Sequence, residues 1–331
     1  AGSNDTGVAV TVLEESTFIM KGGTISKNQT VKYGSSGIMV NRGGTAILNG
    51  GTIENNTTSV NGMASAVHIK GGYVELNGTT IQNNTSADGY GAVYVTDHSS
   101  FGEKWDGILD INGGAIKGNK NANGTANAIY LWDRSSIADK GAYIYFSGSP
   151  DIDGTNIIMS NSSSDVDFKL LKVDGTFTPV RPVELKTEFY YITGQPIVQY
   201  TEGVEADSEH FIAEDENYGF QEDKENNLLY TEARRKVVFM DGDSELTELA
   251  YWEFVEDTVL KPEYQKAGYS LDGWYTDKEL TDEWDFENDI VPRETGEFVL
   301  YSKWSAVPAE APDLTEKNEI ILTCGDTDGT T

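Results

Sequence analysis

The sequence predicts an all-β chain in which a right-handed parallel β-helix is followed by a smaller all-β domain. A Gly-Gly-Thr-Ile motif recurs with a period of about 28 residues, and short segments of alternating polarity lie between its copies. The repeat stops before an acidic region that is rich in aromatic residues. The 331 residues are sufficient for two or three domains.

Isoleucines mark the repeat and predict an aliphatic column inside the coils. The expected members of this column are Ile25, Ile53, Ile81, Ile116 and Ile158, the last belonging to a degenerate copy. In a parallel β-helix, equivalent residues of successive coils stack about 4.8 Å apart. We therefore expect these side chains to lie on top of one another in the interior.

An asparagine follows each of these isoleucines after three residues. The five asparagines are Asn28, Asn56, Asn84, Asn119 and Asn161. Stacked asparagines can pass amide hydrogen bonds along a column and tolerate left-handed turn geometry, so we expect a second ladder here. The alternative is that they are ordinary turn residues without a ladder.

The segments between the motifs predict three short strands in each repeat. Residues 66–69 and 73–76, for example, alternate apolar and polar side chains and are separated by glycine. Over residues 165–232 the glycine period disappears, and we expect irregular closing coils there. The predicted β-helix therefore spans residues 1–232, a second domain spans 233–304, and 305–331 form a linker or truncated tail.

Two motifs carry a family resemblance in the second domain. Residues 268–275 read Gly-Tyr-Ser-Leu-Asp-Gly-Trp-Tyr, and residues 300–304 read Leu-Tyr-Ser-Lys-Trp. With the segments around them, these motifs resemble the internalin-type B-repeat, also called the Listeria-Bacteroides repeat. The resemblance implies a small β-grasp-like module of secreted and surface-anchored bacterial proteins. Large side chains must stabilise so small a unit, and the expected core residues are Trp274, Trp284 and Trp304.

The repeats of the first domain resemble the right-handed parallel β-helix repeats of bacterial surface proteins. That resemblance implies an adhesin-like stalk at the bacterial cell surface, outside the cell. We expect a monomer without enzymatic activity that serves as a stalk or as a module binding a glycan or another host ligand.

Composition excludes several other classes. The 35 glycines and the 38% hydrophobic content disfavour a helical bundle, and no apolar run approaches the roughly 18 residues of a membrane span. A net charge of −30 repels nucleic acid. Cys324 is the single cysteine, and His68, His98 and His210 have no zinc-site spacing, so no metal or other cofactor is expected.

One face of the predicted β-helix carries the candidate binding residues. Stacking the repeats gives an outward column of Met39, His68, Tyr94 and Tyr130, and a second one of Asn41, Lys70, Thr96 and Trp132. Asp97 and Asp133 come next, and each is followed by a longer loop, residues 98–106 and 134–139. The candidate ligand-binding residues are Tyr94, Asp97, Trp105, Tyr130, Trp132 and Asp133.

This set allows three interpretations. If the rings are exposed, they suit the faces of neutral or cationic sugars, with the carboxylates accepting hydrogen bonds from hydroxyls. Alternatively, the aspartates are turn residues and the rings cover the sheet. A carbohydrate-active enzyme, either a polysaccharide lyase or a glycoside hydrolase, is the remaining alternative, because adjacent coils place carboxylates at separations compatible with the about 5–9.5 Å of glycosidases. Only Arg134 lies nearby as a strong base, so no catalytic residue is assigned.

Overall fold

A computed structural model describes residues 7–32, 34–87, 90–100, 103–133, 141–153, 157–161, 171–187, 193–294 and 296–308. It confirms the predicted all-β class, because the described residues contain one 3-10 helix, η1 (Ser208–His210), and otherwise strands. The chain divides into two compact units, Ala1–Arg235 and Lys236–Thr331. Each unit has its own hydrophobic core.

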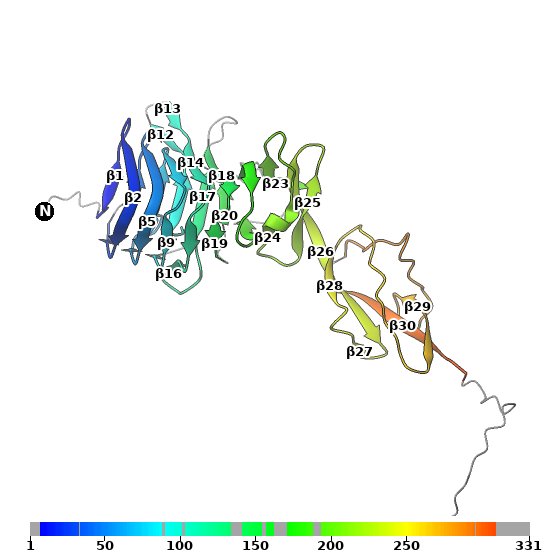
Figure 1. Ribbon diagram of the computed structural model, residues 1–331. Coiled ribbons are helices and arrows are strands. Elements are labelled where there is room, and N and C mark those ends of the chain that lie inside the picture. The colour runs from blue at the N-terminus through cyan, green and yellow to red at the C-terminus, as the bar shows by residue number, and fades with distance from the viewer. Residues whose placement is uncertain are drawn as a thin grey trace, which may run out of the picture. The chain divides into compact units, whose positions relative to one another are not determined.

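Parallel sheets build the first unit, and successive coils supply neighbouring strands, which follow one another from blue to green in Figure 1. Val67, for example, pairs with Ile38 of the preceding coil and with Val93 of the next. The first sheet consists, in spatial order, of β1 (Val10–Val12), β4 (Ile38–Val40), β7 (Val67–Lys70), β11 (Val93–Thr96), β17 (Ile129–Asp133), β20 (Ile157–Asn161), β22 (Val183–Thr187) and β24 (Phe211–Ala213).

The second sheet carries two stacks of strands side by side. β2 and β5 are long enough to belong to both stacks, because Thr45 pairs with Tyr73 and Thr52 pairs with Thr80. The parallel strands of this sheet are β2 (Thr17–Ser26), β5 (Thr45–Glu54), β8 (Tyr73–Leu76), β9 (Thr80–Gln82), β14 (Gly107–Ile111), β15 (Ala115–Lys117), β18 (Ala142–Gly148), β19 (Asp151–Ile152), β21 (Leu171–Phe177) and β23 (Gln195–Tyr200).

A fourth strand per coil was not predicted. Four two-residue strands form a third parallel sheet directly after the asparagines: β3 (Gln29–Thr30), β6 (Thr57–Thr58), β10 (Thr85–Ser86) and β16 (Lys120–Asn121). The inward residues of three of them, Thr30, Thr58 and Ser86, are polar although they are buried. Apolar alternation, the signal for a strand, is therefore missing from these segments.

The aliphatic column is confirmed for its first four members and corrected at the fifth. Ile25, Ile53, Ile81 and Ile116 pair in order along the second sheet. Ile116 then pairs with Ile152, whereas Ile158 lies in the first sheet opposite Tyr130. Ile158 was expected because residues 156–158 read as a degenerate copy of the motif, and the inserted residues change the length of this coil.

The asparagine ladder is confirmed over four coils. The side-chain amide of Asn56 donates to Oδ1 of Asn84 at 3.0 Å, and that of Asn84 donates to Oδ1 of Asn119 at 3.0 Å. Asn28 donates in the same way to Asn56 at 2.8 Å. The side chain of Asn161 lies outside the described residues, and its backbone pairs with Asp133 in the first sheet.

Left-handed geometry occurs one residue before each ladder asparagine, not at the asparagine itself. Lys27, Asn55 and Asn83 have φ angles of 59°, 56° and 55°, and Gly118 has 61°. The turn therefore takes its strain at the preceding residue, where glycine or asparagine tolerates it best. The ladder asparagine remains free to place its amide in the interior.

Regular parallel pairing continues through the segment for which we expected irregular coils. Ile157 pairs with Leu185, and Val183 pairs with Phe211, both at the 28-residue spacing of the earlier coils. After these coils the strands pair antiparallel, where β23 and β25 (Tyr218–Asp223) flank β26 (Leu228–Asp241). Buried apolar side chains maintain the register here without the glycine motif.

The second unit is a smaller sheet built around the C-terminal part of β26. Its other strands are β27 (Ser244–Glu245), β28 (Tyr251–Phe254), β29 (Tyr269–Tyr275) and β30 (Phe298–Ala306). β30 pairs parallel with β26 and antiparallel with β29. Trp274 and Trp284 are buried in the core, as expected. Trp304 is half-buried, and its indole N–H donates to Asp241 at 3.1 Å.

Candidate functional site

The predicted aromatic face lies on the first sheet, and its register is as expected. Met39, His68, Tyr94 and Tyr130 pair in order across β4, β7, β11 and β17. Lys70, Thr96 and Trp132 form the second column. Asp97 and Asp133 follow Thr96 and Trp132 directly, so they stand on adjacent coils.

The tyrosines of this face are buried, which corrects the expectation of an exposed binding stripe. Tyr94 and Tyr130 are 3% and 5% exposed. Tyr90, from the turn before β11, packs over both rings with centroid distances of 5.2 and 4.6 Å, and Ala64 joins the same cluster. Trp132 at the margin is half-buried, as are Tyr90 and Ile158. The rings therefore form a second small core outside the sheet.

His68 lies at the end of this cluster and stays uncharged. Its ring stacks on Tyr94 at a centroid distance of 4.6 Å and is 3% exposed. Burial, assisted by the positive charge of Lys70, lowers the pKa of His68 to about 3. A proton on this imidazole would thus be strongly disfavoured at neutral pH.

Asp97 and Asp133 are also buried, at 5% and 4% exposure. Their position on adjacent coils agrees with the sequence analysis, but a polymeric substrate cannot reach carboxylates that the protein covers. The loop expected over residues 134–139, with Arg134, lies outside the described residues. Asp97 and Asp133 therefore do not belong to a surface that a ligand could reach.

Trp105 lies on a hairpin formed by the inserted residues after β11. The hairpin consists of β12 (His98–Ser100) and β13 (Glu103–Trp105), and the rings of His98 and Trp105 stack at 6.0 Å. The guanidinium of Arg42 lies over the Trp105 ring, 5.1 Å from its centroid. A Cβ on Gly71 would approach His98 Cβ to 2.7 Å. Glycine at this position therefore lets the hairpin pack against the end of β7.

A hollow of about 420 Å³ opens beside this hairpin. It is lined by Leu13, Glu14, Asn41, Arg42, Lys70 and His98. Sequence reasoning placed Asn41 and Lys70 in one column but did not assign them to a site, and it missed Leu13, Glu14 and Arg42. Their shared signal is that they lie at the ends of first-sheet strands, where side chains from successive coils converge.

The second unit has a hollow of about 470 Å³ with a different character. It is lined by Lys261, Glu283, Trp284, Asp285, Phe286 and Glu287. The lining therefore contains three carboxylates and one ammonium group. Within the described parts of the chain, no three His, Cys, Asp or Glu side chains are grouped so that they could hold a metal ion.

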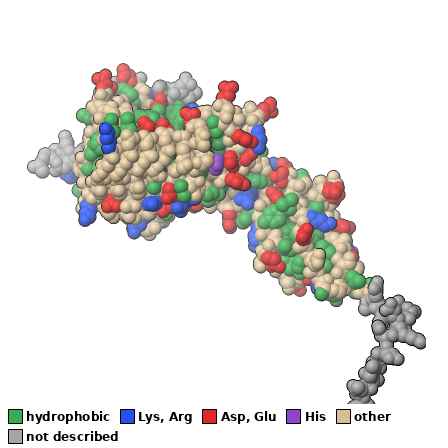
Figure 2. All heavy atoms as spheres, in the orientation of Figure 1, with side chains coloured by type: hydrophobic (Ala, Val, Ile, Leu, Met, Phe, Trp, Pro, Cys, Tyr) green, Lys and Arg blue, Asp and Glu red, His purple; other side chains and the backbone are tan. Residues whose placement is uncertain are grey.

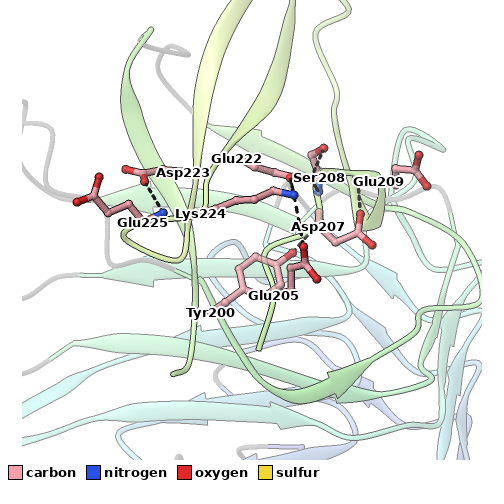
Figure 3. Close-up of polar contacts among 9 residues, drawn as sticks. All are labelled: Tyr200, Glu205, Asp207, Ser208, Glu209, Glu222, Asp223, Lys224 and Glu225. Carbon is pink, nitrogen blue, oxygen red and sulfur yellow. Dashed lines mark hydrogen bonds and ion pairs between the residues drawn. The ribbon is translucent and has the colours of Figure 1, made fainter. Parts of the chain in front are cut away.

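A polar cluster closes the last coils of the first unit (Figure 3). The carboxylate of Glu222 accepts hydrogen bonds from the backbone N–H of Ser208 at 2.9 Å and from its hydroxyl at 3.1 Å. Lys224 lies 3.4 Å from both Glu222 and Glu205. The hydrogen bond from the Ser208 backbone N–H is the main reason why the pKa of Glu222 lies below its ordinary value.

We expect Glu222→Gln to lower the thermal midpoint at pH 7 and to have little effect near pH 3. Because the folded-state pKa is lowered, the stabilisation is present above the unfolded pKa of about 4.3 and is lost as the pH falls through the folded value. A loss of about 1 kcal/mol corresponds to about 2–4 °C for a unit of this size. Calorimetry at both pH values measures it, with exposed Glu225→Gln as the control. Equal shifts at the two pH values would contradict this linkage.

Two comparisons with known proteins bear on the chain. Residues 237–303 match the family model of the Listeria-Bacteroides repeat domain, which confirms the resemblance of the C-terminal unit. A protein of Evansella cellulosilytica described as a Gly-rich membrane protein is 37% identical over 86 residues. That match covers 24% of this chain and 9% of the relative.

These matches indicate a bacterial surface protein, and the described residues have an all-β fold. Among the residues that the structure describes, no helix has the length and hydrophobicity needed to cross a membrane. The space-filling view shows that much of the visible face of the first unit is neither charged nor hydrophobic, with acidic side chains scattered over it (Figure 2).

Proposed function

We propose that the chain belongs to an extracellular bacterial surface protein in which the stacked coils form a non-enzymatic, adhesin-like stalk. The coils act as a rigid spacer, the C-terminal repeat is a module of the same protein, and the chain is a monomer. Ligand contact, with a glycan or another host molecule, belongs to the sides of the stalk.

The observation that carries this proposal is the unbroken parallel register of the first sheet from β1 to β24. Each interface between coils is closed by paired strands, and the interior is filled by buried aliphatic columns and the asparagine ladder. In such a repeat each coil contacts mainly its neighbours, so length can be changed by whole coils. A right-handed parallel β-helix, the winding predicted from the sequence, would have this property.

A coil deletion tests the spacer. Removing residues 157–184 joins residue 156 to Leu185, the residue that pairs with Ile157. Spin labels on Ser59→Cys and Glu214→Cys, in a Cys324→Ser background, report the length by pulsed electron resonance. We expect one narrow distance that shortens by about 4.8 Å after the deletion. Removing only residues 157–170 should destroy cooperative unfolding, because the junction then falls between different sheets.

Two results would contradict the stalk. A broad distance distribution in the parent would show that the coils do not form a rigid spacer. An unchanged distance after the whole-coil deletion would show that the coils are not stacked units.

The carbohydrate-active enzyme remains the second candidate, because Asp97 and Asp133 stand on adjacent coils. Against it stands their burial, at 5% and 4% exposure. Incubation with neutral and acidic polysaccharides should release neither reducing ends nor unsaturated products. Product formation that is lost in Asp97→Asn or Asp133→Asn would overturn the non-enzymatic proposal.

A further inference from the structure

The hollow beside the hairpin is assembled from four consecutive rungs of the first sheet. Glu14 follows β1, Arg42 follows β4, Lys70 ends β7 and His98 follows β11. Because Val12 pairs with Val40 and Val40 with Ile69, these strand ends lie on adjacent rungs about 4.8 Å apart. Residues of successive rungs, which lie 27 to 29 positions apart in sequence, thus converge on one patch.

The charge of the hollow differs from that of the chain. Two cations, Arg42 and Lys70, face one carboxylate, Glu14, in a protein of net charge −30. Glu14 lies 3.5 Å from Arg42, so it compensates one of the two cations. The ammonium of Lys70 and the side-chain amide of Asn41 make no hydrogen bond or ion pair within the described part of the chain. The hollow therefore presents one uncompensated positive charge and an amide able to donate and accept.

An apolar border completes the patch. Leu13, 59% exposed, lines the hollow, and the guanidinium of Arg42 lies over the ring of the half-buried Trp105. The stacking of Trp105 on His98 holds the indole against the hairpin. An exposed apolar side chain next to amide, carboxylate and cationic groups matches the alternating apolar faces and hydroxyl edges of a sugar ring.

We propose that this hollow binds a saccharide residue that carries a single carboxylate, such as a uronic or sialic acid. The carboxylate lies at Lys70 and Arg42, hydroxyls are held by Asn41 and Glu14, and the ring packs against the exposed Leu13. The inference adds a ligand class to the proposed surface stalk and rests on it for its extracellular setting. Glu14 and the overall negative charge disfavour dianions, because every added negative charge is repelled at close range.

Titration of the full chain with glucuronic acid tests the site, with glucose and inorganic phosphate as comparison ligands. We expect glucuronic acid to bind with a dissociation constant of about 0.1–1 mM, as for a shallow site, and glucose and phosphate at least tenfold more weakly. Sialic acid should compete with glucuronic acid. Increasing salt should weaken binding, since the carboxylate contact is exposed and screened.

Substitutions assign the binding to the hollow. Lys70→Ala should weaken glucuronic acid binding at least tenfold, whereas Lys70→Arg should retain most of it. Lys32→Ala removes the same charge from an exposed position outside the hollow and should change affinity less than twofold. Arg42→Gln provides a second variant if Lys70→Ala does not fold, and near-UV circular dichroism checks the fold of each.

Three results would overturn the inference. These are equal affinity for glucose and glucuronic acid, phosphate binding as tight as that of glucuronic acid, and equal losses in Lys70→Ala and Lys32→Ala. The spin-label distances distinguish failure of this inference from failure of the stalk. If only the inference fails, the labels still give one narrow distance that shortens after the coil deletion. If the stalk fails, that distance is broad or does not shorten, independently of sugar binding.

Discussion

Gly114→Ala should destabilise the first unit by roughly 3 kcal/mol or more, as the combined cost of left-handed backbone strain and a forced contact. Gly114 has a φ of +75°, and a Cβ there would lie 2.6 Å from the carbonyl oxygen of Thr79 in the neighbouring coil. The same oxygen accepts the hydrogen bond from Ala115 N–H at 3.1 Å. Relief of the contact would therefore pull apart two coils at a backbone hydrogen bond.

Gly124→Ala is the matched control for this substitution. Gly124 has a φ of +91°, but no atom lies within 4 Å of the position of its Cβ. Gly124→Ala should lower the free energy of unfolding only by the cost of the left-handed backbone, about 1–2 kcal/mol. Urea unfolding followed by tryptophan fluorescence gives both values, and their difference measures the contact between coils. Equal losses would show that coil spacing does not require glycine at residue 114.

This contact explains why glycine was a good guide to the coils and why it failed later in the chain. From the second copy on, the Gly-Gly motifs mark places where a side chain would strike the backbone of the preceding coil, so their period reports the stacking directly. Between Ile157 and Phe211 no such motif remains, and the 28-residue spacing is kept by buried apolar residues such as Leu185. Apolar residues without a fixed turn marker do not reveal their period by inspection.

The exchange of Ile158 for Ile152 has a related cause. The aliphatic column continues into β19, a strand of only two residues, while Ile158 lies in the five-residue β20. Residues 156–158 resemble a copy of the motif, and Asn161 follows Ile158 after three residues as in the earlier copies. The inserted residues removed the regular spacing that would have decided between the two isoleucines. Pairing with Ile116 depends on how the insertion folds, which periodicity does not encode.

The sequence predicts which residues of the site stack in columns, but it does not predict whether their side chains are exposed to solvent. Alternation shows that Tyr94 and Tyr130 point away from the interior, and the register confirms it. Whether an outward residue meets water depends on the neighbouring turn, and here Tyr90 folds back over both rings. Likewise, Arg42 and Trp105 are 63 residues apart in sequence and meet because a hairpin folds over Gly71.

The asparagine ladder should be the main polar element that stabilises the interior, and Asn84→Ala should cost about 3 kcal/mol, as expected when several buried groups lose their partners. Asn84 is fully buried. Its Oδ1 accepts from the N–H and the side-chain amide of Asn56, both at 3.0 Å, and its own amide donates to the carbonyl of Ile53 at 3.0 Å. Alanine would leave donors and an acceptor inside the coil without water to replace them.

A second asparagine column at the surface provides the matched control. Asn77 donates to Asn49 at 2.7 Å and accepts from Asn112 at 3.0 Å, but Asn77 is only half-buried and Asn49 is exposed. Water can replace these bonds, so Asn77→Ala should cost about 0.5–1 kcal/mol. Urea unfolding of both variants measures the comparison. If Asn84→Ala unfolds at the same denaturant concentration as Asn77→Ala, burial adds nothing to the ladder, and the stability of the coils must come from the aliphatic columns alone.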